Sequence, residues 1–312
     1  MYPQTTNNKS LTDKILKLKK EKNAIILAHY YVNSEVQDIA DYIGDSLGLS
    51  QMAGRTDAKI ILFAGVQFMA ETAAVISQEK IVLLPDPTAG CSLAESINAS
   101  DIIEWRKFNK DGIVVSYVNT TADVKAETDI CCTSANALDV INSIPKSKKI
   151  LFTPDKNLGS YIKAKLNRDM DVWSGDCCVH EEFSKESVLN LMSDYPDAHF
   201  LIHPESSCSH DPDIYNNPKV HILSTTGMIK KAGEIEITKF VVVTEPGVIH
   251  QMKMVYPQKE FIPADPKNKC FQMRKVTLEK ILFSLENECY KVEVNQITTK
   301  RARPSITKML EL

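Results

Sequence analysis

The sequence has no apolar run long enough to cross a membrane. Its most hydrophobic window, residues 60–76, spans 17 residues and contains Gln67 and Glu71, whereas a membrane helix needs about 20 largely apolar residues. We therefore expect a strand that leads into a buried helix. The first residues contain no apolar segment of the secretory type, so we expect a cytoplasmic protein without a membrane partner.

An excess of positive charge is also missing. Lys and Arg number 37 against 40 Asp and Glu, which gives a net charge of −3, so the chain lacks the positive field of nucleic-acid-binding proteins. Hydrophobic residues make up 43% of the 312 residues and charged residues 25%. This composition is typical of globular proteins and, at this length, of about two or three domains.

The eight cysteines include no C-x-x-C pair. In a chain without a secretory segment they are expected to stay reduced, and to bind metal, take part in catalysis or pack in a core. The stretch WSGDCCVH, residues 173–180, places Cys177 beside Cys178. Taken alone, these two can be small buried residues, a redox pair or the source of one metal ligand.

A threefold repeat in the spacing of apolar and polar residues separates these possibilities. Apolar runs at 23–31, 111–119 and 198–206 each end in polar residues and predict a strand followed by a helix. A Ser or Thr then follows each strand end at a similar distance. The pairs are His29 and Ser46, Tyr117 and Ser134, and His203 and Thr225, with separations of 17, 17 and 22 residues.

A second strand and a cysteine follow in each unit. The second strands reach Phe63, Phe152 and Val243, which lie 17, 18 and 18 residues beyond the Ser or Thr positions. A third predicted strand leads to the cysteines in register, which are Cys91, Cys177 and Cys270. Agreement at several positions in each unit indicates a true repeat. The repeat selects Cys177 as the partner of the other two and leaves Cys178 as a packing neighbour.

Alternating strands and helices with short connections predict parallel sheets covered by helices. We expect an α/β protein of three three-layer α/β/α domains, related by a pseudo-threefold axis. The predicted domains are 1–92, 93–178 and 179–272, with segment 273–312 joining the first. In open α/β sheets ligands bind beyond the carboxyl ends of the strands, so the active site is expected at the central domain interface.

Three converging cysteines favour an iron–sulfur cluster over zinc. Structural zinc normally takes four ligands, often in close pairs, and no fourth cysteine lies in register. A [4Fe–4S] cluster normally has four cysteine ligands, so ligation by Cys91, Cys177 and Cys270 leaves one iron with an open position. Such an iron acts as a Lewis acid, which predicts dehydration chemistry rather than electron transfer.

The strand ends and helix starts supply the other candidate groups. His and Tyr are common acid–base residues, and a desolvated Glu can act as a base. Helix N-termini bind anions, so a substrate with several carboxylate or phosphate groups is expected. Each residue alone is more often a core residue or an N-cap, but the repeat brings them together. The candidates are His29, Tyr31, Tyr117, Asn119, His203 and Glu205 at strand ends, and Ser46, Ser134 and Thr225, whose side chains are expected to cap helices.

Longer motifs resemble the quinolinate synthase family. The chain contains, in the order typical of that family, HYY, EVQDIADYIGDSL, FMAETA, LPDPTAGC, YVNTTADVKAETDICCTSAN, PDKNLG, WSGDC, VHEEF, HPE and STTGM. The resemblance runs from about residue 23 to the C-terminus. Three places depart from it. Tyr30 stands where many members have Asn, Cys178 stands where Pro is common, and the HPE motif continues with Ser-Ser-Cys where many members have a cysteine directly after Glu.

The resemblance implies an enzyme of NAD biosynthesis with a triangular array of three α/β domains. Members condense iminoaspartate with dihydroxyacetone phosphate to quinolinate, phosphate and water on a [4Fe–4S] cluster held by three cysteines. For this chain it implies coupling to the enzyme that supplies iminoaspartate, and a monomer or homodimer. It assigns the cluster to Cys91, Cys177 and Cys270, substrate contacts or proton transfer to His29, Tyr31, Tyr117, Asn119, His203 and Glu205, and anion binding to Ser46, Ser134 and Thr225.

Two other classes of protein remain open at this point. A small-anion-binding protein of α/β type can use the same helix N-termini without catalysis, and a zinc-stabilised structural protein can use the same thiolates. Neither would have the absorption of an iron–sulfur cluster. For the enzyme, loops near residues 30–36 or 205–217 are expected to close over the site, because a reactive imine requires that water be excluded.

Overall fold

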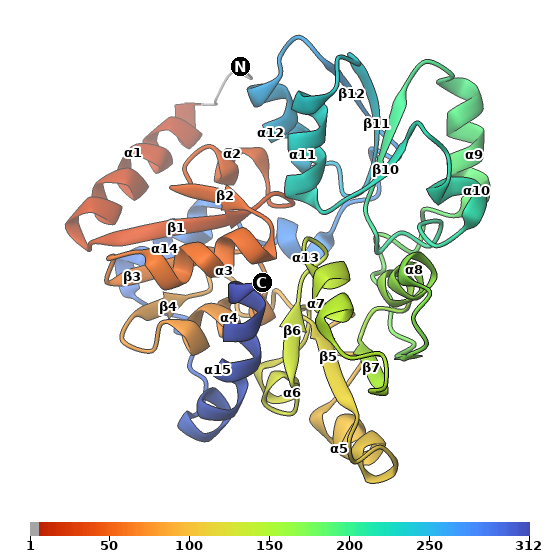
Figure 1. The fold of residues 1–312 in the computed structure, drawn as a ribbon. Coiled ribbons are helices and arrows are strands. Elements are labelled where there is room, and N and C mark those ends of the chain that lie inside the picture. Colours follow the sequence, from red (N-terminus) through yellow and green to blue (C-terminus); the bar gives the residue numbers. More distant parts are fainter. Residues whose placement is uncertain (1–5) are drawn as a thin grey trace.

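The computed structural model describes residues 6–312 of the chain. Within this range the strands form three separate sheets, each of four parallel strands, and helices flank each sheet (Figure 1). The predicted α/β class with three α/β/α units is confirmed. Residues 1–5 of the predicted first domain lie outside the described part, and the boundaries between the domains stay predictions.

The first sheet has the strand order β2-β1-β3-β4. All five residues of β3 are buried, as expected for a parallel strand that is covered on both faces. The window at 60–76 is thus a strand that leads into the largely buried helix α4, as predicted. The elements are α1 (Thr6–Glu21), β1 (Ala24–His29), α2 (Ser34–Gln37), β2 (Tyr42–Gly44), α3 (Ser46–Arg55), β3 (Ile60–Ala64), α4 (Gln67–Ile76) and β4 (Ile81–Leu83).

The second sheet repeats this order as β6-β5-β7-β8. Cys131 and Cys132 lie on its edge strand β6 and are fully buried. The elements are α5 (Ala99–Phe108), β5 (Ile113–Tyr117), α6 (Ala122–Ala126), β6 (Ile130–Cys132), α7 (Ala137–Ser143), β7 (Ile150–Thr153), α8 (Lys156–Leu166) and β8 (Asp171–Val172).

The third sheet has the equivalent order β10-β9-β11-β12. Its longer spacing of 22 residues between His203 and Thr225 comes from the loop 203–211 between β9 and α10, which is longer than the loops 30–33 and 118–121 that lead to the equivalent helices α2 and α6. The elements are α9 (Lys185–Asp194), β9 (His199–Ile202), α10 (Pro212–Tyr215), β10 (Val220–Ile222), α11 (Thr225–Glu234), β11 (Lys239–Val243), α12 (Val248–Val255) and β12 (Glu260–Pro263).

Each sheet contains one strand more than the spacing predicts. The additional strands β2, β6 and β10 have three residues each and lie at one edge of their sheets. Segments of this length are too short to show an alternating pattern. The strand ends that the sequence selected are those of β1, β5 and β9, each of which lies next to one of these edge strands.

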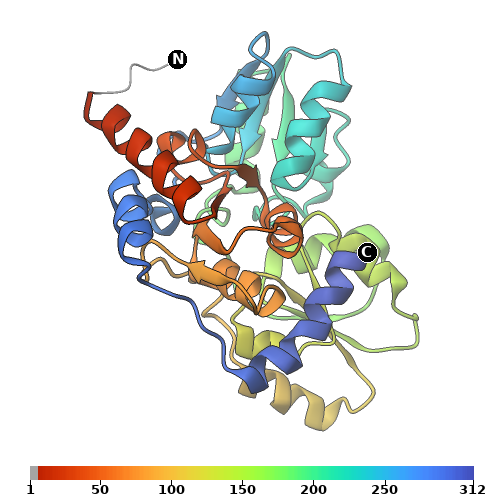
Figure 2. The same ribbon diagram turned by 90° about the vertical axis from the view of Figure 1, so that its left-hand side faces the viewer.

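The C-terminal stretch crosses two of the three units. Three helices follow the last strand: α13 (Phe271–Arg274), α14 (Leu278–Asn287) and α15 (Gln296–Glu311). Helix α14 packs on α1 and β3, so this part returns to the first unit, as expected. Helix α15 also packs on α6 and β6 of the second unit (Figure 2), a contact that the sequence does not predict. Within residues 6–312 no helix is both long and apolar enough to span a membrane.

Candidate active site

The carboxyl ends of the three sheets face one cavity at the centre of the molecule, the central cavity. Its empty volume is about 780 Å³, part of which is open to solvent. All the candidate residues from the sequence lie on its wall, because parallel strands bring their carboxyl ends to one edge of each sheet. They are His29, Tyr31, Ser46, Cys91, Tyr117, Asn119, Ser134, Cys177, His203, Glu205, Thr225 and Cys270.

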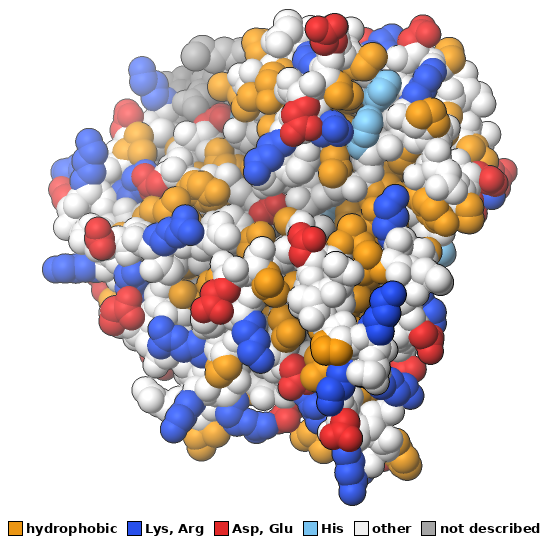
Figure 3. Space-filling view, viewed as in Figure 1, with side chains coloured by type: hydrophobic (Ala, Val, Ile, Leu, Met, Phe, Trp, Pro, Cys, Tyr) orange, Lys and Arg blue, Asp and Glu red, His pale blue; other side chains and the backbone are white. Residues whose placement is uncertain are grey.

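A second cavity adjoins the first and opens near the centre of the face in Figure 3. Residues of α3, α7 and α11 line it, which are equivalent helices of the three units. The two cavities share Asp45 and Ser134. This recess is therefore a path from solvent toward the central cavity, and the exposed cation Lys230 of α11 lies on its wall.

His29 and His203 follow the same local pattern in two different units. His29 Nδ1 accepts a hydrogen bond from the Tyr31 backbone N–H at 3.2 Å, and His203 Nδ1 accepts one from the Glu205 N–H at 3.4 Å. Burial lowers the pKa of His29 to about 4 and the pKa of His203 to about 3. Both rings are thus neutral at pH 7, and because Nδ1 accepts, the proton of each ring lies on Nε2.

Tyr117 and Glu205 join the second and third units. The Tyr117 hydroxyl donates a short hydrogen bond to Glu205 Oε1. Burial alone would raise the pKa of the Glu205 carboxyl, but the neighbouring His180 and His203 and the Tyr117 hydroxyl hold that pKa at about 2. Burial and the Glu205 charge raise the pKa of Tyr117 well above its usual value. The pair therefore combines a carboxylate with a protonated phenol at neutral pH.

His180 is a residue of the site that the sequence analysis missed. It is 1% exposed, and its Nδ1 lies 3.2 Å from Glu205 Oε2 and 3.2 Å from Cys177 Sγ. Its ring also stacks on His203, with ring centroids 4.5 Å apart. The available signal was the spacing Cys177-x-x-His180, which places both side chains on one turn.

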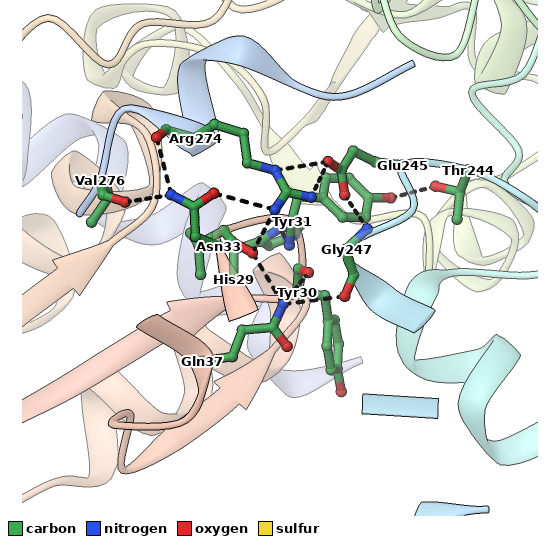
Figure 4. Close-up of polar contacts among 11 residues, drawn as sticks. His29, Tyr30, Tyr31, Asn33, Gln37, Thr244, Glu245, Gly247, Arg274 and Val276 are labelled. Atoms are coloured by element: carbon green, nitrogen blue, oxygen red, sulfur yellow. Dashed lines mark hydrogen bonds and ion pairs between the residues drawn. The ribbon is translucent and has the colours of Figure 1, made fainter. Parts of the chain in front are cut away.

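Thr244, the residue after β11, extends this network to the first unit. Its Oγ1 lies 2.6 Å from the Tyr31 hydroxyl oxygen (Figure 4). The same oxygen lies 2.8 Å from His180 Nε2. For a neutral His180 ring, donation from Nδ1 to the Glu205 carboxylate leaves Nε2 to accept from Thr244, which in turn accepts from Tyr31. A continuous chain of hydrogen bonds thus runs from Tyr31 through Thr244 and His180 to Glu205.

The three cysteines in register also line the central cavity. Burial raises the pKa of Cys91 to about 12, that of Cys270 to about 11 and that of Cys177 well above its usual value. The Cys91 thiol raises the pKa of Cys177, and the Cys270 thiol raises the pKa of both, because the sulfurs converge. Backbone N–H groups two or three residues further along oppose these shifts at each sulfur. Such sulfurs become thiolates only beside a strong positive charge, as a bound metal supplies.

A second set of possible metal ligands overlaps with this one. One ligand atom each from Cys177, His180 and Glu205 lie within 4.8 Å of one another. Cys177 belongs to both sets. Cys178, in contrast, is exposed, although it also lines the central cavity.

The predicted N-caps are wrong, although the helices begin close to the predicted positions. Ser46 and Thr225 are the first residues of α3 and α11, and the caps are the preceding residues. Asp45 Oδ1 accepts from Gly48 N at 3.0 Å, and Ser224 Oγ accepts from Gly227 N at 3.3 Å. Ser134 lies before α7, whose N-cap position is Asn136.

This correction changes what the three hydroxyls can do. Within residues 6–312, the side chains of Ser46, Ser134 and Thr225 make no hydrogen bond to another residue, yet all three face the central cavity. They are therefore free to bind a ligand there. Asp45 is occupied, since its second oxygen lies 3.3 Å from Ser224 Oγ.

Asn119 presents a buried polar atom without a partner. Its Oδ1 is inaccessible to solvent and makes no hydrogen bond within the described residues. Buried polar atoms are nearly always paired, and an exception in a cavity wall points to a missing ligand or water. Asn119 follows β5 by two residues and lines the central cavity.

Comparison with known proteins identifies the relatives of this chain. Residues 13–311 match the family described as "Quinolinate synthetase A protein". The chain belongs to this family. Among the quinolinate synthases similar to it, that of Pyrobaculum aerophilum is 47% identical and aligns over 96% of this chain and 99% of its own length. Those of Thermus thermophilus and Trichodesmium erythraeum are 45% and 46% identical, over 96% and 97% of this chain and 97% and 94% of theirs.

Proposed function

We propose that this protein is a quinolinate synthase, which condenses iminoaspartate with dihydroxyacetone phosphate and releases phosphate and water. Membership of the quinolinate synthase family supports the reaction. The observation that carries the proposal is the central cavity, where one cysteine from each unit lies beside the strand-end acid–base groups. A binding protein without catalysis has no need of this combination.

We propose a [4Fe–4S] cluster as the cofactor, held by Cys91, Cys177 and Cys270. The donor set fits, because three half-buried thiols with raised pKa values become thiolates together only beside bound metal cations, and a cluster takes cysteine thiolates as its ligands. When bound, the cluster supplies an iron with an open position that acts as a Lewis acid. A single ion on Cys177, His180 and Glu205 is the weaker candidate, since it leaves Cys91 and Cys270 without a role.

The hydrogen-bond chain of the site suggests how protons move. Burial raises the pKa of Tyr31 well above its usual value, so its hydroxyl holds its proton at neutral pH and serves as an acid. The chain through Thr244 and His180 can return a proton to Tyr31 after each transfer. Glu205, a carboxylate, is the base at the other end of the chain, and Tyr117 is the second phenol within its reach.

The remaining groups hold the substrates. His29 and His203 offer neutral Nε2–H donors, which suit carbonyl and carboxylate oxygens. The hydroxyls of Ser46 and Thr225 lie at the first turns of α3 and α11, where backbone N–H groups and the helix dipole favour anions. We assign carboxylate and phosphate groups to these hydroxyls and to Ser134, and a donor group of the substrate to Asn119 Oδ1.

Anaerobic purification followed by iron and sulfide assays and an absorption spectrum tests the cofactor. The same preparation, supplied with dihydroxyacetone phosphate and enzymatically generated iminoaspartate, tests the reaction. We expect a brown protein with about four irons per chain that forms quinolinate. A colourless protein that binds zinc tightly would instead support a structural protein, and one that binds small anions without turnover would support a binding protein.

A further inference from the structure

A buried ion pair lies next to the site but takes no part in the proton chain. Glu245 follows Thr244 on the connection after β11, and its side chain is 0% exposed. Arg274, the last residue of α13, places Nη2 at 2.7 Å and Nε at 3.2 Å from Glu245 Oε1 (Figure 4). Glu245 Oε2 accepts from the Gly247 N–H at 2.5 Å, so both carboxylate oxygens are bound.

This ion pair holds the loop that carries Tyr31. Arg274 Nη1 lies 3.4 Å from Val32 O and 3.4 Å from Asn33 Oδ1. The Asn33 side chain donates in return to Arg274 O at 3.2 Å and to Val276 O at 3.1 Å. Residues 30–33, the Tyr31 loop, are thereby attached to the C-terminal segment.

Gln37 attaches the same loop to the third unit. Its Nε2 lies 2.8 Å from Tyr30 O, 3.1 Å from Val32 O and 3.1 Å from Gly247 O (Figure 4). Gln37 is 1% exposed. The Tyr31 loop, the residues 244–247 and the segment 270–276 therefore meet at one junction around the Glu245–Arg274 pair.

Gly247 shows how closely these three segments approach. A Cβ at this position would lie 2.6 Å from Glu245 Oε2, 2.7 Å from Tyr30 O and 2.9 Å from Arg274 Nη2. The backbone φ of Gly247 is −59°, which any residue can adopt, so the glycine is required by space and not by conformation. Each of the three segments contributes one of the atoms that exclude a side chain.

The junction has a catalytic group on one side and a cluster ligand on the other. The side chain of Thr244, the residue before Glu245, is hydrogen-bonded to the Tyr31 hydroxyl. Arg274 N lies 3.2 Å from Cys270 O, which joins the ion pair to the candidate ligand through one helical turn. Buried ion pairs add little to stability compared with apolar residues, but they demand one geometry, because a displaced partner leaves an uncompensated charge.

We propose that the Glu245–Arg274 pair positions Tyr31, holding its hydroxyl at a fixed place relative to Cys270 and the substrate. Glu245 and Arg274 are positioning residues, since neither lines the central cavity. The expected effect on kcat rests on the proposed function, whereas the expected attachment of the Tyr31 loop does not. A displacement of about 1 Å at a reacting group can cost about 100-fold in rate, so kcat is the parameter that the pair should control.

Kinetics of Glu245→Gln in the cluster-loaded enzyme test this assignment. We expect kcat to fall by about 30- to 100-fold with KM changed by less than about threefold, since the substrate-binding hydroxyls are untouched. Asp129→Asn, which breaks an ion pair of the same length (2.7 Å) with Arg106 outside the site, is the matched control and should keep kcat. Arg274→Lys should lower kcat less than Glu245→Gln does, because it keeps the positive charge and loses only the contact of two nitrogens with Glu245 Oε1.

A double-mutant cycle separates positioning of Tyr31 from a general structural role. If the pair acts through the Tyr31 hydroxyl, Glu245→Gln should slow the wild type strongly but should barely slow a Tyr31→Phe enzyme. An equal slowing of both enzymes would overturn the proposal. If Glu245→Gln does not fold, Gly247→Ala replaces it in the cycle, because it separates the same segments without changing a charge.

Hydrogen exchange provides a readout that needs no turnover. Amides of residues 30–37 should exchange at least about tenfold faster in Glu245→Gln than in the wild type or in Asp129→Asn, with the cluster content unchanged. A wild type that forms no quinolinate would refute the proposed function, and exchange would still decide whether the junction holds the loop. Unchanged exchange at residues 30–37 would refute the junction in either case.

Discussion

The Tyr31 hydroxyl oxygen lies 2.6 Å from Thr244 Oγ1, so a strand end of the first unit is bonded directly to a strand end of the third. The next partner, His180, lies 2.8 Å from the same Thr244 oxygen and belongs to the segment after the second sheet. Acid–base groups from separate sheets are thereby held in one chain. The chemistry of this site therefore depends on how the units are placed relative to one another.

Replacement of Tyr31 by Phe removes the first group of this chain. Turnover should fall roughly 100-fold or more, as expected for the loss of a positioned acid. The ring packing survives, so the free energy of unfolding should fall by no more than about 1–2 kcal/mol, the cost of one buried hydrogen bond. Quinolinate formation measured anaerobically, with the cluster absorbance as a check on cofactor content, gives the result.

The neighbouring Tyr30 provides a matched control for this variant. It is buried to a similar degree, 7% exposed against 8% for Tyr31, but its side chain does not line the central cavity. Tyr30→Phe should keep near-native turnover. If Tyr31→Phe also keeps it, Tyr31 is a packing residue and proton transfer must begin at Glu205 or the histidines.

Serine replacements identify the cluster ligands. Cys91→Ser, Cys177→Ser and Cys270→Ser should each abolish the brown absorption and the bound iron and sulfide, because a hydroxyl is a poor substitute for a thiolate ligand. Cys178→Ser should retain them, since Cys178 is exposed and stands outside the register of the repeat. Retention of the cluster in Cys177→Ser, with its loss in Cys178→Ser, would show that the neighbours exchange roles.

The spacing of the repeat predicted which residues would line the central cavity together, because the chain topology decides this. His29, Tyr117 and His203 stand at equivalent strand ends, and the carboxyl ends of parallel strands necessarily lie at one edge of a sheet. His180 could not be found this way, because it lies in the segment between β8 and α9, where no strand end marks a register. Its position becomes clear only when Cys177, His203 and Thr244 are placed around it.

The exact N-cap residues of the helices could not be predicted from the sequence. Ser46 and Thr225 were predicted as caps, and the caps are Asp45 and Ser224, one residue earlier. All four residues are Ser, Thr or Asp, which favour N-cap or first-turn positions, so residue type does not distinguish one neighbour from the next. The side chain that bonds the third amide is decided by backbone geometry, which the sequence does not contain.

Acid should destabilise the protein through His29 and His203, two of its buried histidines. The pKa values of His29 and His203 are about 4 and about 3 in the folded protein, against 6.5 for an exposed histidine. Below pH 6.5 the unfolded chain therefore binds protons that the folded chain does not, and the free energy of unfolding falls as the pH drops toward 4. Each histidine can cost about 1.4 kcal/mol per pH unit in this window, and neither has an effect above it.

Urea unfolding of wild type and His203→Asn between pH 7 and pH 4.5 measures this effect. The variant should lose the contribution of His203 to the pH slope, up to about 1.4 kcal/mol per pH unit, while His29 continues to contribute. Protonation of Glu205 lowers the free energy of unfolding only at lower pH. Its pKa is about 2 in the folded protein, against 4.5 for an exposed glutamate, so this effect begins below about pH 4.5. An unchanged slope in His203→Asn would mean that the ring is protonated, or already accessible, in the folded state.

Asn119 offers a test in which binding and stability change in opposite directions. Its buried Oδ1 has no partner within the described residues, and an unpaired buried polar atom costs about 1–3 kcal/mol. Asn119→Leu, of similar size and without polar atoms, should therefore leave the free energy of unfolding unchanged or raise it. If Oδ1 accepts a hydrogen bond from the substrate, KM should rise about tenfold, equivalent to about 1.4 kcal/mol of binding, with the cluster intact. Steady-state kinetics and urea unfolding on one preparation give both values. A variant that is destabilised while its KM is unchanged would show that Asn119 supports the fold through an ordered water, and that the substrate makes no contact with it.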